Sequence, residues 1–214
     1  MTSEQLIEEG RKLERPCCFL KAQGPGPVAD IWYERDDDEI DSTGHHCWLT
    51  VDTRHVPGLS PSVTGFISVF TNENECQGGR VEVTSSWPKR RGIQLYAHST
   101  SVLPPIDAVF FRGSESVGKW LRVNGWQRDW LYNDNFKDKQ VAGAYQKTFT
   151  GEYPVYIDSG IYAVLGGWHL PFPDPDWQEL IDEHLMVMTI RDSEPWVEAW
   201  HTSAGQFRVI QRTT

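Results

Sequence analysis

The first half of the chain alternates short apolar segments with turns, a pattern that is typical of β-strands. Residues 2–13 show a helical pattern instead. Leu6, Ile7 and Leu13 form a weak apolar stripe, and Thr2 with Gln5 fits a helical capping box. We therefore predict a helix over residues 2–13. The strands predicted after it lie at residues 17–20, 28–33, 47–51, 65–70, 80–84, 93–97 and 108–111.

The pattern changes beyond residue 112, where apolar positions recur at helical spacing. A helix is predicted between Ser114 and Gly125, and a second over 134–149, in which Val141, Tyr145 and Phe149 follow one another every fourth residue. A further helix is expected to begin near residue 174. Strands are predicted at 153–157, 162–165, 185–190, 196–201 and 206–211, with the last two joined as a hairpin and 185–190 central and covered on both faces.

These elements predict an α+β fold with mostly antiparallel or mixed sheets and three to four helices. We expect residues 1–214 to form a single globular unit. Its candidate subdomains are residues 1–111, which are β-rich, and residues 112–214, which mix helices and strands. No flexible linker separates them, so we expect the two subdomains to pack closely together.

Composition excludes a disordered chain and makes nucleic acid a poor partner. Hydrophobic residues make up 39% of the sequence, and ten tryptophans supply large surfaces for burial. The formal charge of −10 would repel the phosphates of a polyanion over most of the surface. A basic protein or a neutral small molecule is therefore the expected partner.

The sequence also predicts a cytoplasmic location. Residues 1–16 are polar and charged rather than signal-like, and no apolar run is long enough to span a bilayer. The four cysteines, Cys17, Cys18, Cys47 and Cys76, show no C-x-x-C spacing. We interpret them as reduced thiols that act as small hydrophobic residues.

The segment from Gly166 to Trp177 is the most specific local feature. Its two glycines end a strand, Trp168 and His169 follow, and three prolines stiffen the remainder. A stiff loop with an aromatic tip loses little entropy on binding, which favours a ligand or partner site. The alternative is that Trp168 packs against its own scaffold.

A second candidate lies in the predicted strand 196–201. Alternation in a strand places Trp196, Glu198 and Trp200 on one face, so that a carboxylate sits between two indoles. Such a group could act as an acid or bind a cationic or sugar ligand. The alternative is that both tryptophans are core residues and that Glu198 pairs with an arginine such as Arg208.

Other clusters of chemically active residues fail the requirements of known sites. His46, Asp52 and His55 would converge on a metal only if the chain bent near Thr53. The acidic run 34–41 lacks the glycine and glutamate positions of a calcium loop, and the basic run 88–92 is too small to specify nucleic acid. Phosphate-loop, dinucleotide and nucleophile-elbow motifs are absent from the sequence, so we predict neither a metal nor a cofactor.

Two functional hypotheses remain. The preferred one is a non-catalytic binding or interaction protein of the bacterial accessory kind, of which toxin-neutralising proteins are one example. It rests on the acidic charge, the candidate exposed aromatics and the lack of catalytic spacing. The alternative is an enzyme that acts on a small molecule or carbohydrate, with a carboxylate and a histidine beside a tryptophan platform. Its candidate residues are Glu198, Asp176, His169, Trp168, Trp196 and Trp200.

Overall fold

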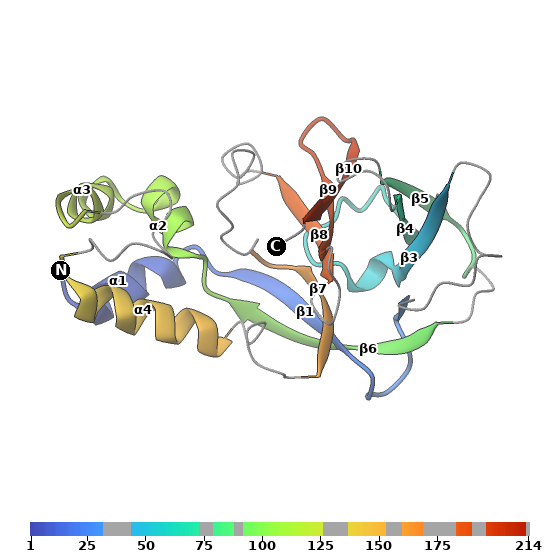
Figure 1. Ribbon diagram of the computed structural model, residues 1–214, viewed down its shortest axis with the longest axis horizontal. Helices are drawn as coiled ribbons and strands as arrows, with labels where there is room; N and C mark the ends of the chain where they lie inside the picture. The colour runs from blue at the N-terminus through green and yellow to red at the C-terminus, as the bar shows by residue number, and fades with distance from the viewer. Residues whose placement is uncertain are drawn as a thin grey trace. The chain divides into compact units, whose positions relative to one another are not determined.

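The computed structural model describes residues 1–31, 44–72, 79–87, 92–125, 137–152, 160–168, 183–189 and 196–212. Within these ranges the chain forms four α-helices, one short 3-10 helix and ten β-strands (Figure 1). All strand pairs of defined register are antiparallel. The predicted α+β class, with mostly antiparallel or mixed sheets and three to four helices, is confirmed for the described residues.

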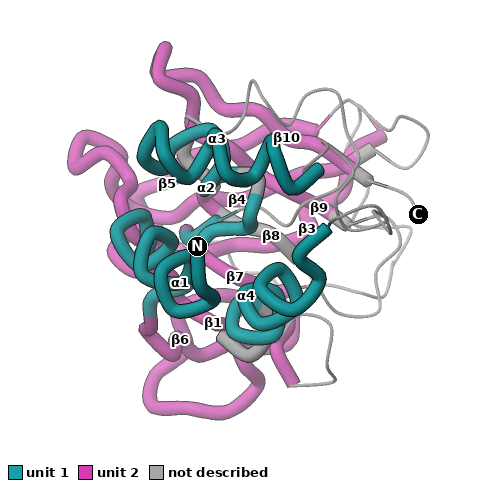
Figure 2. Tube along the Cα trace, turned by 90° about the vertical axis from the view of Figure 1, so that its left-hand side faces the viewer, with its two compact units in different colours: residues 1–15, 101–158, 167–182 teal, residues 16–100, 159–166, 183–214 magenta. Residues whose placement is uncertain are grey.

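The chain divides into two compact units (Figure 2). The helical unit contains residues 1–15, 101–158 and 167–182, and the sheet unit contains residues 16–100, 159–166 and 183–214. The sequence pattern suggested one boundary near residue 112, whereas the chain passes between these units several times. Segments that are far apart in sequence therefore build each unit.

The strands follow one continuous order, β10-β9-β8-β7-β1-β6-β2-β3-β4-β5. β10 also lies against β5 and β4, which stand at the opposite end of that order, so the sheet curls strongly. The close approach needs Gly79, because a Cβ atom there would collide with Val209 of β10. The strand bounds are β1 (Arg15–Lys21), β2 (Ala29–Ile31), β3 (His45–Asp52), β4 (Phe66–Asn72), β5 (Arg80–Thr84), β6 (Ile93–Val102), β7 (Ile161–Gly166), β8 (His184–Thr189), β9 (Trp196–His201) and β10 (Phe207–Arg212).

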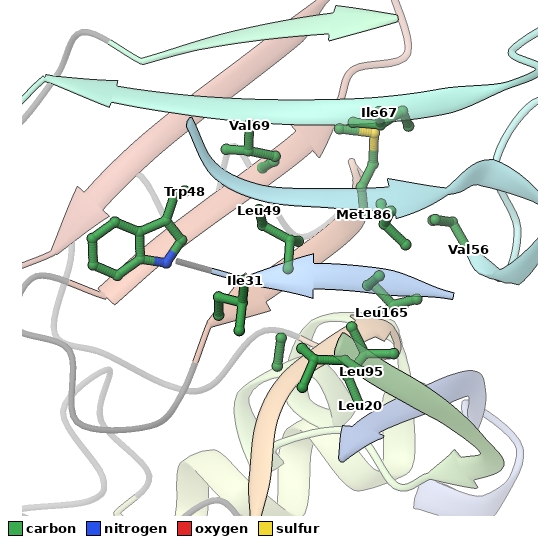
Figure 3. Packing of buried hydrophobic residues seen from close by; sticks show 14 of the residues in the cluster. Leu20, Ile31, Trp48, Leu49, Val56, Ile67, Val69, Leu95, Leu165 and Met186 are labelled. Carbon is green, nitrogen blue, oxygen red and sulfur yellow. The ribbon is translucent and has the colours of Figure 1, made fainter. Parts of the chain in front are cut away.

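One hydrophobic core fills the inner side of the curled sheet (Figure 3). Because side chains alternate along a strand, residues two apart on several of the strands enter this core. In β3, for example, Leu49 and Val51 are fully buried in the core, while Thr50 between them faces the outer side. Further core residues from neighbouring strands include Leu20, Ile31, Ile67, Val69, Leu95, Leu165, Met186, Val197 and Val209.

The helical unit is built from α1 (Ser3–Arg11), α2 (Ile106–Arg112), α3 (Glu115–Val123) and α4 (Lys139–Glu152). The predicted capping box starts α1: the Gln5 backbone N–H donates to Thr2 Oγ1, and the Thr2 N–H donates to Gln5 Oε1. α1 packs beside α4, where the predicted face of Val141, Tyr145 and Phe149 is buried. These side chains therefore form the centre of the helical unit's packing.

Residues 108–111 form part of α2, so the strand predicted there is wrong. The segment Ala108–Phe111 is apolar and too short to show a helical or strand period. The two prolines before it act as a helix start rather than as a turn, with Pro105 in an extended conformation at the N-cap. The prolines that predict a turn between strands thus precede a helix instead.

Most of the other predicted elements are present. The hairpin of β9 and β10 pairs Phe207 with His201 and Arg212 with Trp196, and Gly205 takes a positive φ of 77° in its loop. Gly125 follows α3 with a φ of 85°, as a helix-ending glycine does. The strand predicted at 153–157 and the helix expected from residue 174 lie outside the described residues.

Candidate functional site

An open groove of about 720 Å³ lies between α1 and α3 in the helical unit. One wall comes from the start of the chain and α1, and the other comes from α3. The groove is lined by Met1, Glu4, Gln5, Glu8, Glu9, Ser116, Val117 and Trp120. Carboxylates therefore face one side of the groove, and an indole faces the other.

The sequence places these side chains through two amphipathic helices. Leu6 and Gly10 bury one side of α1, and Gly10 lets it approach α4 so closely that an added Cβ would strike the Tyr145 ring. Glu4 and Glu8 are four residues apart, so they are neighbours on an exposed part of α1. In α3, Val117 is buried and Trp120, one turn later, is half-buried. The acidic wall and the aromatic wall thus follow from helical periodicity.

Hydrogen bonds favour the charged forms of Glu4 and Glu9 in this groove. A hydrogen bond from Lys12 lowers the pKa of Glu9, and this interaction also raises the pKa of Lys12. Backbone N–H donation lowers the pKa of Glu4, and the Thr2 hydroxyl adds to the effect. Since Lys12 is engaged with Glu9, the groove presents an acidic surface.

The sheet unit holds a different polar arrangement on the outer side of the curled sheet. Strand register aligns one polar residue from each of five neighbouring strands, β6, β2, β3, β4 and β5. The three central residues, Asp30, Thr50 and Ser68, are buried, and the Thr50 and Ser68 hydroxyls share a hydrogen bond of 2.8 Å. The whole row, called here the polar row, is Gln94, Asp30, Thr50, Ser68 and Glu82.

Trp87 contacts the polar row at Asp30. Its Nε1 donates to Asp30 Oδ2 at 2.6 Å, and its ring packs edge-on against Phe66 with 5.0 Å between centroids. Burial raises the pKa of Asp30, while the hydrogen bond from Trp87 opposes that rise. Asp30 is only 4% exposed, so this carboxyl is part of the internal packing of the sheet unit.

The structure places Glu198 and Trp200 side by side on β9. Val197 and Ala199 point into the inner core, which leaves Glu198 and Trp200 on the outer side, as strand alternation predicts. Trp200 Nε1 donates to Glu198 Oε2 at 3.1 Å, and both residues are fully buried. Their cross-strand neighbours on β10 are Ile210 and Arg208, respectively.

Trp168 is buried in the packing of the helical unit. Its Nε1 donates to the Leu13 carbonyl at 2.9 Å, and the Arg15 guanidinium lies 3.5 Å from the centre of its ring. The predicted candidates His169 and Asp176 lie outside the described residues, as does the side chain of Trp196. Of the predicted set, the structure brings together only Glu198 and Trp200.

No three His, Cys, Asp or Glu side chains converge as metal ligands in the described part of the chain. His46 Nε2 lies 3.4 Å from Thr71 Oγ1, and Asp52 is engaged by Arg54. Cys17, Cys18 and Cys47 are buried thiols, and burial raises the pKa of Cys17 to about 12. Cys76 lies outside the described residues.

Comparison with protein-family models, with curated proteins and with solved structures gave no match for this chain. Among the described helices, none is both long enough and apolar enough to cross a membrane. Inferences about function therefore depend on the geometry of the two units.

The α1–α3 groove was missed at the sequence level, although its elements were visible there. The helix at the start of the chain carries three glutamates within six residues, and Trp120 was assigned to an apolar helix face. The pairing of α1 with α3 was not readable, because more than 100 residues separate them. A search for acidic helix faces would have selected α1, but not its partner.

Proposed function

We propose that this protein is a non-catalytic binding protein that holds a basic polypeptide partner in the α1–α3 groove. The observation that carries the proposal is the groove itself, with carboxylates of Glu4, Glu8 and Glu9 on one wall and Trp120 on the other. Aromatic anchors with a charged rim are typical of protein interfaces. The formal charge of −10 would steer a basic partner toward the protein.

The groove suggests how such a partner would bind. An arginine or lysine of the partner would approach the carboxylates of α1 and place its aliphatic stem or guanidinium against the Trp120 ring. A cation held between a carboxylate and an indole gains from both interactions. The charges would mainly speed association, while burial of Trp120 would slow dissociation.

This proposal places the protein among accessory proteins that act on another protein, with toxin neutralisation as one example. A cytoplasmic location fits it, because Cys17, Cys18 and Cys47 are buried thiols rather than disulfides. The enzyme alternative draws no support from Glu198, because that carboxyl is fully buried. We therefore propose only the binding function and not the enzyme alternative.

The proposal is tested by photo-crosslinking in a lysate of the source organism. A photoreactive benzoylphenylalanine replaces Ser116, an exposed residue that lines the groove, and captured polypeptides are identified by mass spectrometry. We expect one predominant basic polypeptide. Its yield should fall in a Glu4→Gln/Glu8→Gln variant, because the attraction between opposite charges is removed.

The matched control places the same crosslinker at Ala204, an exposed residue of the hairpin loop in the sheet unit. Capture there should remain at background. Equal capture from Ser116 and Ala204, or equal capture by the Glu4→Gln/Glu8→Gln variant, would show that the groove does not select the partner.

A further inference from the structure

The connection between β3 and β4 folds into a closed loop at one end of the sheet unit. Residues 53–65 form it, and the Thr53 backbone N–H and hydroxyl both donate to the Gly65 carbonyl at 3.0 Å. Gly65 has a φ of 104°, a backbone conformation that residues other than glycine rarely adopt. These contacts tie the two ends of the loop together, so its interior is shaped in advance of any binding.

A cavity of about 550 Å³ lies within this loop. Its size falls in the range of small-molecule sites, roughly 300–1,000 Å³. Val56 belongs to the inner core of the sheet unit, and Leu59 and Val63 pack against that core, so the cavity has an apolar floor. The lining residues are Asp52, Thr53, Arg54, Val56, Leu59, Ser60, Pro61, Val63, Thr64, Gly65 and Phe66.

Asp52 fixes the position of Arg54 beside this apolar floor. Asp52 is buried, and its Oδ1 accepts the backbone N–H and Nε of Arg54, each at 3.0 Å. Its Oδ2 accepts Nε at 3.0 Å and Nη2 at 2.5 Å. The Arg54 side chain is nevertheless 80% exposed, so the guanidinium is oriented by a buried carboxylate while it faces solvent.

We propose that this cavity binds a small carboxylate that carries an apolar tail. The carboxylate receives hydrogen bonds from the Nη1 edge of Arg54, which the Asp52 contacts leave available. The tail lies against Val56, Leu59 and Val63. The same chemistry occurs in a free aliphatic acid and in the C-terminal residue of a peptide.

The geometry favours an anionic ligand over a cationic one, despite the overall negative charge. Both Asp52 oxygens already accept two hydrogen bonds each, which uses the acceptor sites of a carboxylate. A ligand amine would have to break the ion pair to reach Asp52. A ligand carboxylate meets a guanidinium that is already oriented, and pre-organisation lowers the entropic cost of binding.

The test compares three probes of equal chain length, octanoate, 1-octanol and octylamine, by NMR titration of the full-length protein. We expect octanoate to shift backbone amides within residues 52–66 and to bind at least about tenfold more tightly than 1-octanol, as a charge-assisted hydrogen bond implies. An Arg54→Gln variant should bind octanoate no better than 1-octanol. The exposed Arg112, in the helical unit, supplies the control, and Arg112→Gln should leave octanoate binding unchanged.

Two further experiments are needed. The first distinguishes a free acid from a peptide C-terminus as the source of the carboxylate, and the second distinguishes this inference from the proposed function of the groove. A short peptide that ends in leucine is offered with a free or an amidated C-terminus, and a peptide ligand requires the free form to bind more tightly than octanoate. Glu4→Gln/Glu8→Gln should not change octanoate binding, because neither glutamate lines the cavity. No shifts within residues 52–66, octylamine binding as tight as octanoate, or full octanoate binding by Arg54→Gln would overturn the inference.

Discussion

The polar row of the sheet unit and the groove of the helical unit differ in the exposure of their polar side chains. In the sheet unit, the central residues of the polar row are buried, and Asp30 and Thr50 have protein hydrogen-bond partners. In the helical unit, Glu4 and Glu8 are exposed along an open groove. Buried polar groups with protein partners stabilise and specify a fold, whereas recognition requires groups that a partner can reach. The contrast directs the search for a surface that binds a basic partner to the groove rather than to the polar row.

A second contrast lies within the sheet unit, between two buried carboxyls. Burial raises the pKa of Asp30, whereas hydrogen bonds from Arg54 lower the pKa of Asp52. Both residues are at most 5% exposed, so burial alone does not decide the direction. Asp52 has a cationic partner and Asp30 has a neutral indole. The charge of the partner therefore determines which form of a buried carboxyl the fold favours.

The largest effect is expected on the free energy of unfolding, which should respond to a substitution in the sheet core but not to one in the groove. Ile67→Ala removes a fully buried side chain and should lower the free energy of unfolding by about 2–5 kcal/mol, because it leaves a cavity. Glu4→Gln/Glu8→Gln should change that free energy far less, because both side chains are exposed. Urea denaturation measures both values. A groove variant as unstable as the core variant would mean that the glutamates serve the fold.

The next effect concerns Trp120 as the aromatic wall of the groove. Trp120→Ala should weaken binding of the captured partner by about 2 kcal/mol, or roughly 30-fold, as the loss of an interface anchor does. Calorimetric titration with the purified partner gives the dissociation constant. Trp87→Phe in the sheet unit is the matched aromatic control and should leave that constant unchanged. The reverse ranking of the two variants would place the interface on the sheet unit.

An effect of similar size is expected when one hydroxyl is removed from the polar row. Thr50→Val keeps the shape of the side chain but leaves the buried Ser68 hydroxyl without its 2.8 Å partner. The free energy of unfolding should fall by about 1–3 kcal/mol, the usual cost of such a loss. Thr50→Val/Ser68→Ala, which removes both hydroxyls, should recover part of it. If the double variant is no more stable than the single one, the hydrogen bond does not explain the cost.

The smallest effect is the pH dependence of the two buried carboxyls. The folded state holds the Asp30 proton more tightly than the unfolded state, so its contribution to stability is lost as pH rises above the usual value of about 3.9. Asp30→Asn stays neutral and still offers Trp87 an acceptor oxygen. The stability of this variant relative to the native protein should therefore increase from acidic to neutral pH.

Asp52→Asn should show the opposite trend. The stabilising charge of Asp52 is present above about pH 3.9 and is lost as pH falls through its lowered folded pKa, so the variant should be least favourable at neutral pH. Denaturation curves at several pH values measure both trends. Parallel trends for the two variants would show that Arg54 and Trp87 do not distinguish these carboxyls.

Local chemistry explains which parts of the fold the sequence predicted. The capping box of α1, the buried face of Val141, Tyr145 and Phe149, and the hairpin glycine at 205 each depend on residues close together in the chain. Residues 80–84 form β5 with the predicted bounds. Such signals do not depend on distant contacts, so the sequence alone predicts these features.

Long-range arrangement explains what the sequence did not predict. The apolar segment of α2, residues 108–111, predicts a strand as well as a helix, and only its packing within the helical unit decides between the two. The interleaved segments of the two units and the α1–α3 groove join residues far apart in the chain. Alternation places Glu198 and Trp200 on one face, and the full burial of Trp200 agrees with the alternative in which this tryptophan is a core residue.

The central claim is that the acidic groove of the helical unit binds a basic partner. The most direct test is the dissociation constant of the polypeptide captured through Ser116, measured for the native protein and for Glu4→Gln/Glu8→Gln between about 50 and 200 mM salt. We predict that the native protein binds about tenfold more tightly at low salt and that the gap narrows as salt increases. Equal constants for the two proteins across this range would contradict the claim.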